Sequence, residues 1–209
     1  MTDDVPPDMP PDMAPETPPD MPPDMPPDTA PDTPPDVPPD MAPDTKDWTW
    51  VLERPCPACG FDCSALDRYA LPGLIRAAVA PWRDVLRRPD AAVRPDPATW
   101  SPLEYACHVR DVCRVFSTRV LLMREHDNPG FDNWDQDRTA VTERYLAQDP
   151  ARVSAEVVVA GEQAAQAFSG VTGAEWDRHG RRSNGSEFTI DTLGRYFLHD
   201  LRHHVRDVD

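Results

Sequence analysis

The stretch WSPLEYACHVRD, residues 100–111, decides the fold because it contains a complete start signal for a helix. Ser101 is a favoured N-cap residue, Pro102 suits the first helical position, and Glu104 follows the cap at the capping-box spacing. Beyond this start, apolar side chains continue along one helical stripe: Tyr105, Val109, Val112, Phe116, Val120 and Met123. We therefore predict a long helix that begins after Ser101 and buries one face.

Three further segments have apolar residues at the same spacing, namely 72–88, 149–170 and 189–208. We expect Pro81 to kink the first of them, whereas Asp149 with Pro150, and Thr189, provide start signals for the other two. Strand-like alternation is nearly absent. The predicted fold class is therefore all-α, with an antiparallel-type four-helix bundle over residues 47–209.

Two connections between these helices have features of their own. The long connection 126–148 is predicted to contain a short helix at 138–146. The polar segment 178–187 is predicted to be a loop. Two roles stay open for this loop: a solvated connection, or a border of the functional site whose Arg181 and Arg182 bind an anionic substrate.

Residues 1–46 differ in composition from the rest of the chain. From Val5 to Asp44 the sequence repeats a four-residue unit: a variable residue, then Pro or Ala, then Pro, then Asp or Glu. Proline fixes φ and removes the amide donor, so this repeat favours an extended, polyproline II-like chain. We predict a disordered acidic tail that acts as a solubilising spacer. The alternative is a Pro-rich ligand for a groove, because Pro7 and Pro10 have the P-x-x-P spacing.

The net charge is divided unevenly between the tail and the remaining chain. The chain has a formal net charge of −16, and residues 1–45 hold twelve carboxylates and no Lys or Arg, which leaves −4 for the remainder. Nucleic-acid interfaces and anionic membranes both require clustered Lys and Arg. We therefore expect no nucleic-acid and no membrane partner. A cytoplasmic location is expected as well, because neither a signal-peptide pattern nor a membrane-length apolar run is present.

The histidines are the residues of this sequence that most directly indicate a chemical function, which is metal binding. His199 and His203 are four residues apart on the predicted last helix, so their rings leave the same face and can share one ion. His108 lies about 60° from the centre of its apolar stripe, at an inward or cleft-edge position. The same helical-wheel arithmetic leaves a plain solvated pair open for His199 and His203. It places His204 nearer the apolar stripe, as a partly buried core histidine.

Two motifs resemble those of the DinB/YfiT-like superfamily. Residues 100–111 are similar to its W-S-x-x-E-x-x-x-H-x-x-D stretch, and the ending LHDLRHHVRDV, residues 198–208, is similar to its terminal His-rich helix. The resemblance implies a four-helix bundle that binds a divalent metal, often Zn²⁺ or Ni²⁺, through three histidines. By motif position these are His108, His199 and His203, and such a site leaves one position open for water or substrate.

The resemblance also implies a class of activity. Members of this family include low-molecular-weight-thiol S-transferases and thiol-dependent isomerases, so the metal would convert a bound thiol to thiolate or a water to hydroxide. We expect a divalent-metal-dependent thiol S-transferase or hydrolase acting on a small molecule, with a low-molecular-weight thiol as co-substrate of the transfer. The alternative is a non-catalytic metal-binding module with the tail as its interaction or solubility element. A homodimer stays open.

Glu104 has two interpretations. It lies four residues before His108 on the same helical face, so as a catalytic residue it could orient a ligand or accept a proton. Its other role is the capping-box partner of Ser101, which the spacing favours.

The chain has five cysteines: Cys56, Cys59, Cys63, Cys107 and Cys113. An odd count without a secretory signal argues against a disulfide framework. The pair Cys56 and Cys59, followed by glycine, resembles a zinc knuckle, but a structural zinc needs four ligands. Cys63 together with His126 or His179 could complete such a set. The other interpretation is reduced thiols in a turn, and the last two cysteines fit small buried helix positions.

Overall fold

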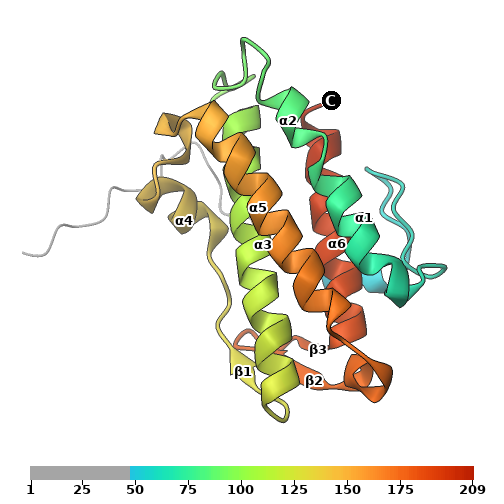
Figure 1. Cartoon of the computed structure of the whole chain (residues 1–209). Coiled ribbons are helices and arrows are strands. Elements are labelled where there is room, and N and C mark those ends of the chain that lie inside the picture. The colour runs from blue at the N-terminus through green and yellow to red at the C-terminus, as the bar shows by residue number, and fades with distance from the viewer. Residues whose placement is uncertain (1–47) are drawn as a thin grey trace, which may run out of the picture. The chain divides into compact units, whose positions relative to one another are not determined.

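The computed structural model describes residues 48–209, which are mainly helical (Figure 1). The α-helices are α1 Leu71–Val79, α2 Trp82–Val85, α3 Pro102–Glu125, α4 Gln136–Thr142, α5 Pro150–Ser169 and α6 Ile190–Asp207. The 3-10 helices are η1 Thr49–Leu52, η2 Arg68–Ala70, η3 Tyr145–Ala147 and η4 Gly173–Asp177, and the strands are β1 Gly130–Phe131, β2 His179–Arg182 and β3 Glu187–Thr189. The expected tail, residues 1–46, lies outside the described residues.

The start of α3 has the predicted capping box. Ser101 Oγ accepts a hydrogen bond from the Glu104 amide at 3.3 Å, and Glu104 Oε2 accepts one from the Ser101 amide at 2.9 Å. Asp149 and Thr189 cap α5 and α6, each with a side-chain oxygen that accepts from backbone amides of the first turn. These bonds satisfy amides that have no partner within the helix, which fixes where each helix begins.

Pro81 separates two helices instead of kinking one. α1 ends at Val79 and α2 starts at Trp82, with Pro81 as its N-cap. Proline has no amide hydrogen and its ring crowds the preceding turn, so the helical hydrogen-bond series stops there.

The helices α1, α3, α5 and α6 form the predicted bundle, and α3 and α5 run in the same direction within it (Figure 1). Near their starts, Arg110 Nη1 donates to Glu156 Oε2 at 2.7 Å. At the other end of α3, Arg124 Nε donates to Glu175 Oε1 at 3.2 Å, just beyond the end of α5. The antiparallel pairs of the bundle are therefore α3 with α6 and α1 with α5.

The directions of α1 and α6 follow from the close contact of Gly194 with Leu71 and Phe168. A Cβ at Gly194, near the start of α6, would lie 2.7 Å from Leu71 Cδ1 and 2.8 Å from Phe168 Cε1. Leu71 is the first residue of α1 and Phe168 is the penultimate residue of α5, so α1 and α6 both start where α5 ends. Both helices then run against α3 and α5.

The long connection 126–149 makes the shared direction of α3 and α5 possible. It contains α4 and η3, close to the helix predicted at 138–146. A short link between consecutive helices forces them antiparallel, whereas a long crossover lets the chain return to the starting end.

The segment 178–187, predicted as a loop, contains β2 and the first residue of β3, so that prediction is wrong. β2 pairs antiparallel with β3, β1 pairs parallel with β2, and Gly185 occupies the turn with a φ of 95°. The strands are short and mostly polar, so they leave no apolar alternation in the sequence. The Arg182 guanidinium lies over the rings of Phe188 and Tyr196, at 5.4 and 5.7 Å from their centroids.

The bundle core contains a run of aromatic rings contributed by three helices. Phe197 of α6 stacks on Phe116 of α3 and Phe168 of α5, with centroids 4.9 and 6.0 Å apart. Cys107 and Cys113 are buried and free, as predicted. Among residues 48–209, no helix is both long enough and apolar enough to cross a membrane.

Candidate metal centres

Helix α6 presents two pairs of metal-ligand side chains at i,i+4 spacing. His199 pairs with His203, and Asp200 pairs with His204. Successive helical residues are rotated by about 100°, so the two pairs leave neighbouring faces of the helix. The Asp200 pair faces α3, and the His199 pair faces the segment that precedes α1.

The first group, which we name the α3–α6 cluster, consists of His108, Asp200 and His204. One ligand atom from each lies within 4.8 Å of the other two. His108 Nε2 is 3.5 Å from Asp200 Oδ2, and His204 Nε2 is 3.6 Å from Asp200 Oδ1. The carboxylate therefore lies between two imidazoles from two helices.

Aromatic rings surround the α3–α6 cluster. His108 is 1% exposed, and its ring stacks on Trp134 at 5.3 Å between centroids and 15° between planes. Trp100 lies 5.5 Å from the same ring, and Tyr105 lies 5.2 Å from the ring of His204. These rings limit the access of water to His108.

Several polar atoms of this cluster are buried without a partner. Within residues 48–209, His108 Nδ1, His108 Nε2 and Asp200 Oδ2 have no hydrogen-bond partner. Buried polar atoms in proteins are nearly always hydrogen-bonded or bound to an ion. Of these atoms, His108 Nε2 and Asp200 Oδ2 lie 3.5 Å apart and fit a cation held between them, whereas His108 Nδ1 is on the other side of the ring.

The pKa values of the cluster have opposing causes. Burial lowers the pKa of His108 and so keeps its ring neutral, which is the form that binds metals. Burial also acts to lower the pKa of His204, but the carboxylates of Asp200 and Asp207 outweigh it and raise that pKa to about 9, so a metal that binds His204 at pH 7 must displace a proton from its ring. Burial would raise the pKa of Asp200, yet the His204 and His108 rings hold it well below its usual range.

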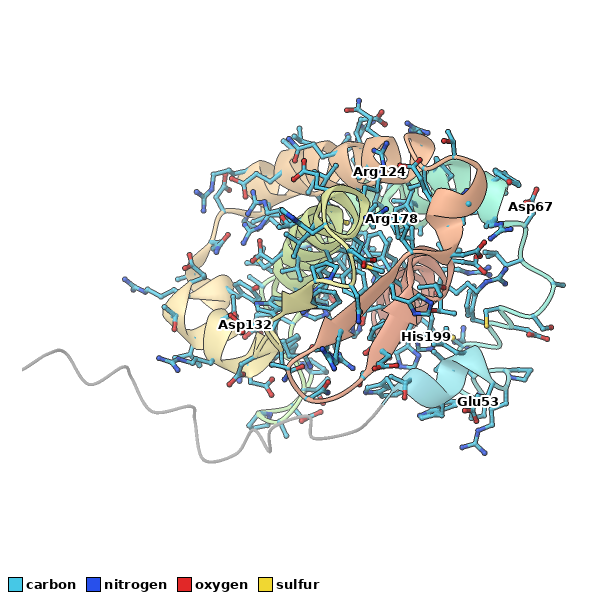
Figure 2. The ribbon with its side chains drawn as sticks, turned by 90° about the horizontal axis from the view of Figure 1, so that it is seen from below. Glu53, Asp67, Arg124, Asp132, Arg178 and His199 are labelled. Carbon is cyan, nitrogen blue, oxygen red and sulfur yellow. The ribbon has the colours of Figure 1, made fainter. Side chains whose placement is uncertain are left out.

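The second group, which we name the knuckle cluster, consists of Cys56, Cys59, His199 and His203. One ligand atom from each lies within 4.8 Å of the other three. Cys56 Sγ is 3.6 Å from His203 Nδ1. Figure 2 shows His199 beside η1, the short helix that is followed by Glu53. Burial, with the nearby His203 ring, lowers the pKa of His199 to about 4, so its imidazole is neutral at pH 7.

The structure divides the three histidines expected to share one ion. His199 and His203 lie together, as their spacing indicated, but His108 lies with Asp200 and His204 in the other cluster. The assignment from the sequence did not include Asp200 and His204. The position of His204 near the apolar stripe, with a carboxylate one turn before it, was the available signal.

Glu104 belongs to neither cluster. Its Oε2 accepts from Ser101 Oγ at 2.8 Å and from Arg94 Nε at 2.9 Å, and its Oε1 accepts from Arg94 Nη2 at 2.5 Å. Burial would raise its pKa, but the Arg94 and Ser101 hydrogen bonds outweigh it and lower the pKa below 4.5. This geometry accounts for Glu104 as a capping and ion-pairing residue, and its catalytic role stays a prediction.

The residues considered from the sequence as partners for Cys56 and Cys59 lie elsewhere. Cys63 Sγ donates to the Val51 carbonyl at 3.3 Å, and His126 and His179 are exposed. The structure brings two histidines of α6 to the cysteine pair instead.

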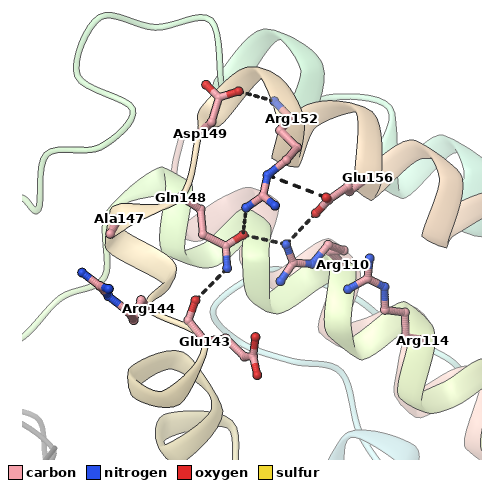
Figure 3. A pocket seen from close by; sticks show the side chains of 9 residues that line it. All are labelled: Arg110, Arg114, Glu143, Arg144, Ala147, Gln148, Asp149, Arg152 and Glu156. Carbon is pink, nitrogen blue, oxygen red and sulfur yellow. Dashed lines mark hydrogen bonds and ion pairs between the residues drawn. The ribbon is translucent and has the colours of Figure 1, made fainter.

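A polar hollow of about 630 Å³ lies between the starts of α3 and α5 and the end of the crossover (Figure 3). It is lined by Arg110, Arg114, Glu143, Arg144, Ala147, Gln148, Asp149, Arg152 and Glu156. Arg110 Nη1 donates to Gln148 Oε1 and Glu156 Oε2, both at 2.7 Å, and its other edge pairs with Asp111. The central guanidinium is thus occupied by the protein's own acceptors.

The fold and the two clusters define a four-helix-bundle protein with metal-ligand side chains on its last helix. The sequence model of the DinB superfamily matches residues 74–208, and the chain belongs to that superfamily. A search of curated proteins finds no significant match.

Among solved structures, the fold is similar to that of YfiT from Bacillus subtilis. The TM-score is 0.60 at 12% sequence identity, over 68% of this chain and 86% of YfiT. YfiT is described as a probable metal-dependent hydrolase with an unusual four-helix bundle topology. At this identity the similarity concerns the fold.

Proposed function

We propose that this protein is a divalent-metal-dependent hydrolase of a small-molecule substrate, with the α3–α6 cluster as its metal site. The observation that carries the proposal is the convergence of ligand atoms from His108, Asp200 and His204 within 4.8 Å, together with the buried His108 Nε2 and Asp200 Oδ2, which have no hydrogen-bond partner within residues 48–209. The description of YfiT as a probable metal-dependent hydrolase supports the same reaction class.

The ligand types of the cluster suit this chemistry. Two imidazoles and one carboxylate are a known ligand set of catalytic zinc sites, where the fourth position holds water. A metal held there by His108, Asp200 and His204 would lower the pKa of a bound water to about 7 and would so supply hydroxide at neutral pH. Zn²⁺ and Ni²⁺ both accept imidazole ligands, and the cluster does not distinguish between them.

The remaining side chains around the cluster orient and shield it. Asp207 Oδ2 accepts from His204 Nδ1 at 2.9 Å, which turns His204 Nε2 toward Asp200. Trp134 and Trp100 cover the His108 ring and keep the surroundings poorly hydrated. A dry site strengthens the electrostatic interactions between charged groups inside it.

A panel of esters, amides and phosphoesters, assayed with the Zn²⁺-loaded and the Ni²⁺-loaded protein, tests the proposal. We expect turnover of at least one class by the wild type. His108→Gln removes one ligand, so kcat/KM should fall by more than about 100-fold. His126→Ala is the matched control, because that histidine is exposed and belongs to neither cluster.

Activity that is equal in wild type and His108→Gln would place the chemistry elsewhere. Absence of turnover by a protein that binds metal in the α3–α6 cluster would favour the non-catalytic module. Thiol S-transfer stays a prediction, and the same panel with added low-molecular-weight thiols tests it. A rate that depends on the thiol would replace hydrolysis by transfer as the reaction at this cluster.

A further inference from the structure

We propose that Cys56, Cys59, His199 and His203 form a closed, tetrahedral zinc site that fastens the segment before α1 to α6. This site is separate from the α3–α6 cluster and is structural, because four protein ligands leave no position for substrate. The proposal does not depend on the hydrolase activity.

The cysteine half of the site is a tight turn of the kind that presents two thiolates to one ion. The Gly60 amide donates to the Cys56 carbonyl at 2.8 Å, and the Cys56 amide donates to the Phe61 carbonyl at 2.9 Å. Gly60 has a φ of 70°, which a side chain would disfavour. The turn thus holds Cys56 and Cys59 on one side, facing α6.

The histidine half comes from one face of α6. His199 and His203 are one turn apart, and their ring centroids are 5.1 Å apart. In a tetrahedral site, sulfur at about 2.3 Å and nitrogen at about 2.05 Å from zinc lie about 3.6 Å from each other. The Cys56 Sγ to His203 Nδ1 separation is 3.6 Å, which matches that edge.

The orientations of the two rings provide independent support. Asp207 Oδ1 lies 3.7 Å from His203 Nε2, on the ring edge away from Cys56. Metal-binding histidines usually direct their second nitrogen toward a carboxylate in this way. His199 Nε2 is buried and has no hydrogen-bond partner within the described chain, so this nitrogen is available as a metal ligand.

The surroundings of the knuckle cluster indicate a structural role. Cys56 is 1% exposed and His199 is 3% exposed. Trp48 packs on both histidine rings, at 5.9 Å from His199 and 5.2 Å from His203, and Phe61 lies 5.8 Å from His199. Thiolates favour a softer ion such as zinc over magnesium or calcium.

Zinc content and Co²⁺ spectroscopy of the full-length protein test the proposal. We expect the purified wild type to bind one equivalent of zinc that the Cys56→Ser/Cys59→Ser double variant lacks. Cys63→Ser is the matched control, because that thiol belongs to neither cluster and a hydroxyl can keep its bond to the Val51 carbonyl. It should retain the full zinc content.

The Co²⁺-loaded wild type gives a result that does not depend on the folding of any variant. A thiolate-to-cobalt charge-transfer band together with the visible bands of tetrahedral cobalt is expected. Absence of the thiolate band overturns the proposal, as does a zinc content in the double variant equal to that of the wild type. His108→Gln distinguishes the two clusters, since it should leave the thiolate band unchanged.

Discussion

Glu104 combines two roles in one buried carboxylate. It receives bonds from the Ser101 amide and hydroxyl at the start of α3, and it forms an ion pair with Arg94. The carboxylate is nearly inaccessible, whereas 23% of the Arg94 side chain is exposed. Partial burial makes such a pair stronger than a surface pair, because water and salt screen it less.

The Glu104→Gln variant should be less stable than the wild type by about 2 kcal/mol at pH 7, the scale of hydrogen bonds to charged groups. The folded-state pKa of Glu104 lies below its unfolded value of 4.5. The stability that it contributes is therefore present above pH 4.5 and lost as the pH falls through the folded pKa. Urea unfolding of both proteins at pH 7 and at acidic pH measures this loss, and a pH-independent difference would contradict it.

At Gly161, helix α5 packs closely on α1, and a substitution at this residue tests that packing. A Cβ at Gly161 would lie 2.7 Å from Val79 Cγ2 and 3.2 Å from Val79 Cβ. Gly161→Ala should destabilise the protein by about 1–3 kcal/mol through overpacking, although alanine favours the helix by about 1 kcal/mol. Gly73→Ala in α1 is the control, because nothing lies within 4 Å of its added Cβ. Chemical denaturation of both variants should give shifts of opposite sign.

At the scale of elements, helix starts were predictable because they are local. Ser101 with Glu104, Asp149 and Thr189 all cap helices by bonds to amides within a few residues. The partners of α6 were not predictable in this way. Spacing shows that His199 and His203 share a face, but it cannot show that Cys56 faces them, since 147 residues separate Cys56 from His203. The strands β2 and β3 were not predicted for a different reason: they contain few apolar residues, so the sequence shows no alternating pattern there.

The segment that holds η1 and the cysteine turn should depend on zinc for its attachment. A ligand that binds only the folded state, at a concentration of 1,000 times its Kd, raises the free energy of unfolding by about 4 kcal/mol, and removing the ligand loses that amount. For a chain of this size that corresponds to a Tm lower by roughly 8–16 °C. Thermal unfolding of the zinc-loaded and the chelator-treated protein measures the difference.

Limited proteolysis at Glu53, an exposed residue next to η1, gives a local measure of the same attachment. Cleavage there should speed up on chelation in the wild type. It should be fast with or without zinc in the Cys56→Ser/Cys59→Ser variant. Equal cleavage rates for the zinc-loaded and the chelated wild type would show that the segment is held without metal.

At the scale of the whole molecule, the shared direction of α3 and α5 follows from the crossover 126–149. The sequence predicted a long connection that contains a helix, and its four helical segments made the bundle predictable, although the first of them is divided into α1 and α2. The relative direction of α3 and α5 depends on which end of the bundle the crossover reaches. Contacts distant in the sequence, such as Arg110 with Glu156, decide this.

Residues 1–45 should be dispensable for the folded domain. A Pro-rich acidic repeat has little apolar surface to bury, so its deletion should leave the Tm and the metal content unchanged. Thermal unfolding and metal analysis of the deletion variant against the full chain measure this. A Tm lower by several degrees would show that the repeat packs on the domain.

The two ligand pairs on α6 have the same i,i+4 spacing and are offset from each other by a single residue. Inserting one residue between Leu198 and His199 would move His199 and His203 into the places of Asp200 and His204. Three histidines would then meet at α3, and Cys56 and Cys59 would lose both partners, while Asp200 would take the place of the buried Leu201. A single-codon insertion would thus exchange the two proposed mixed-ligand sites for one all-histidine cluster, at a cost in core packing.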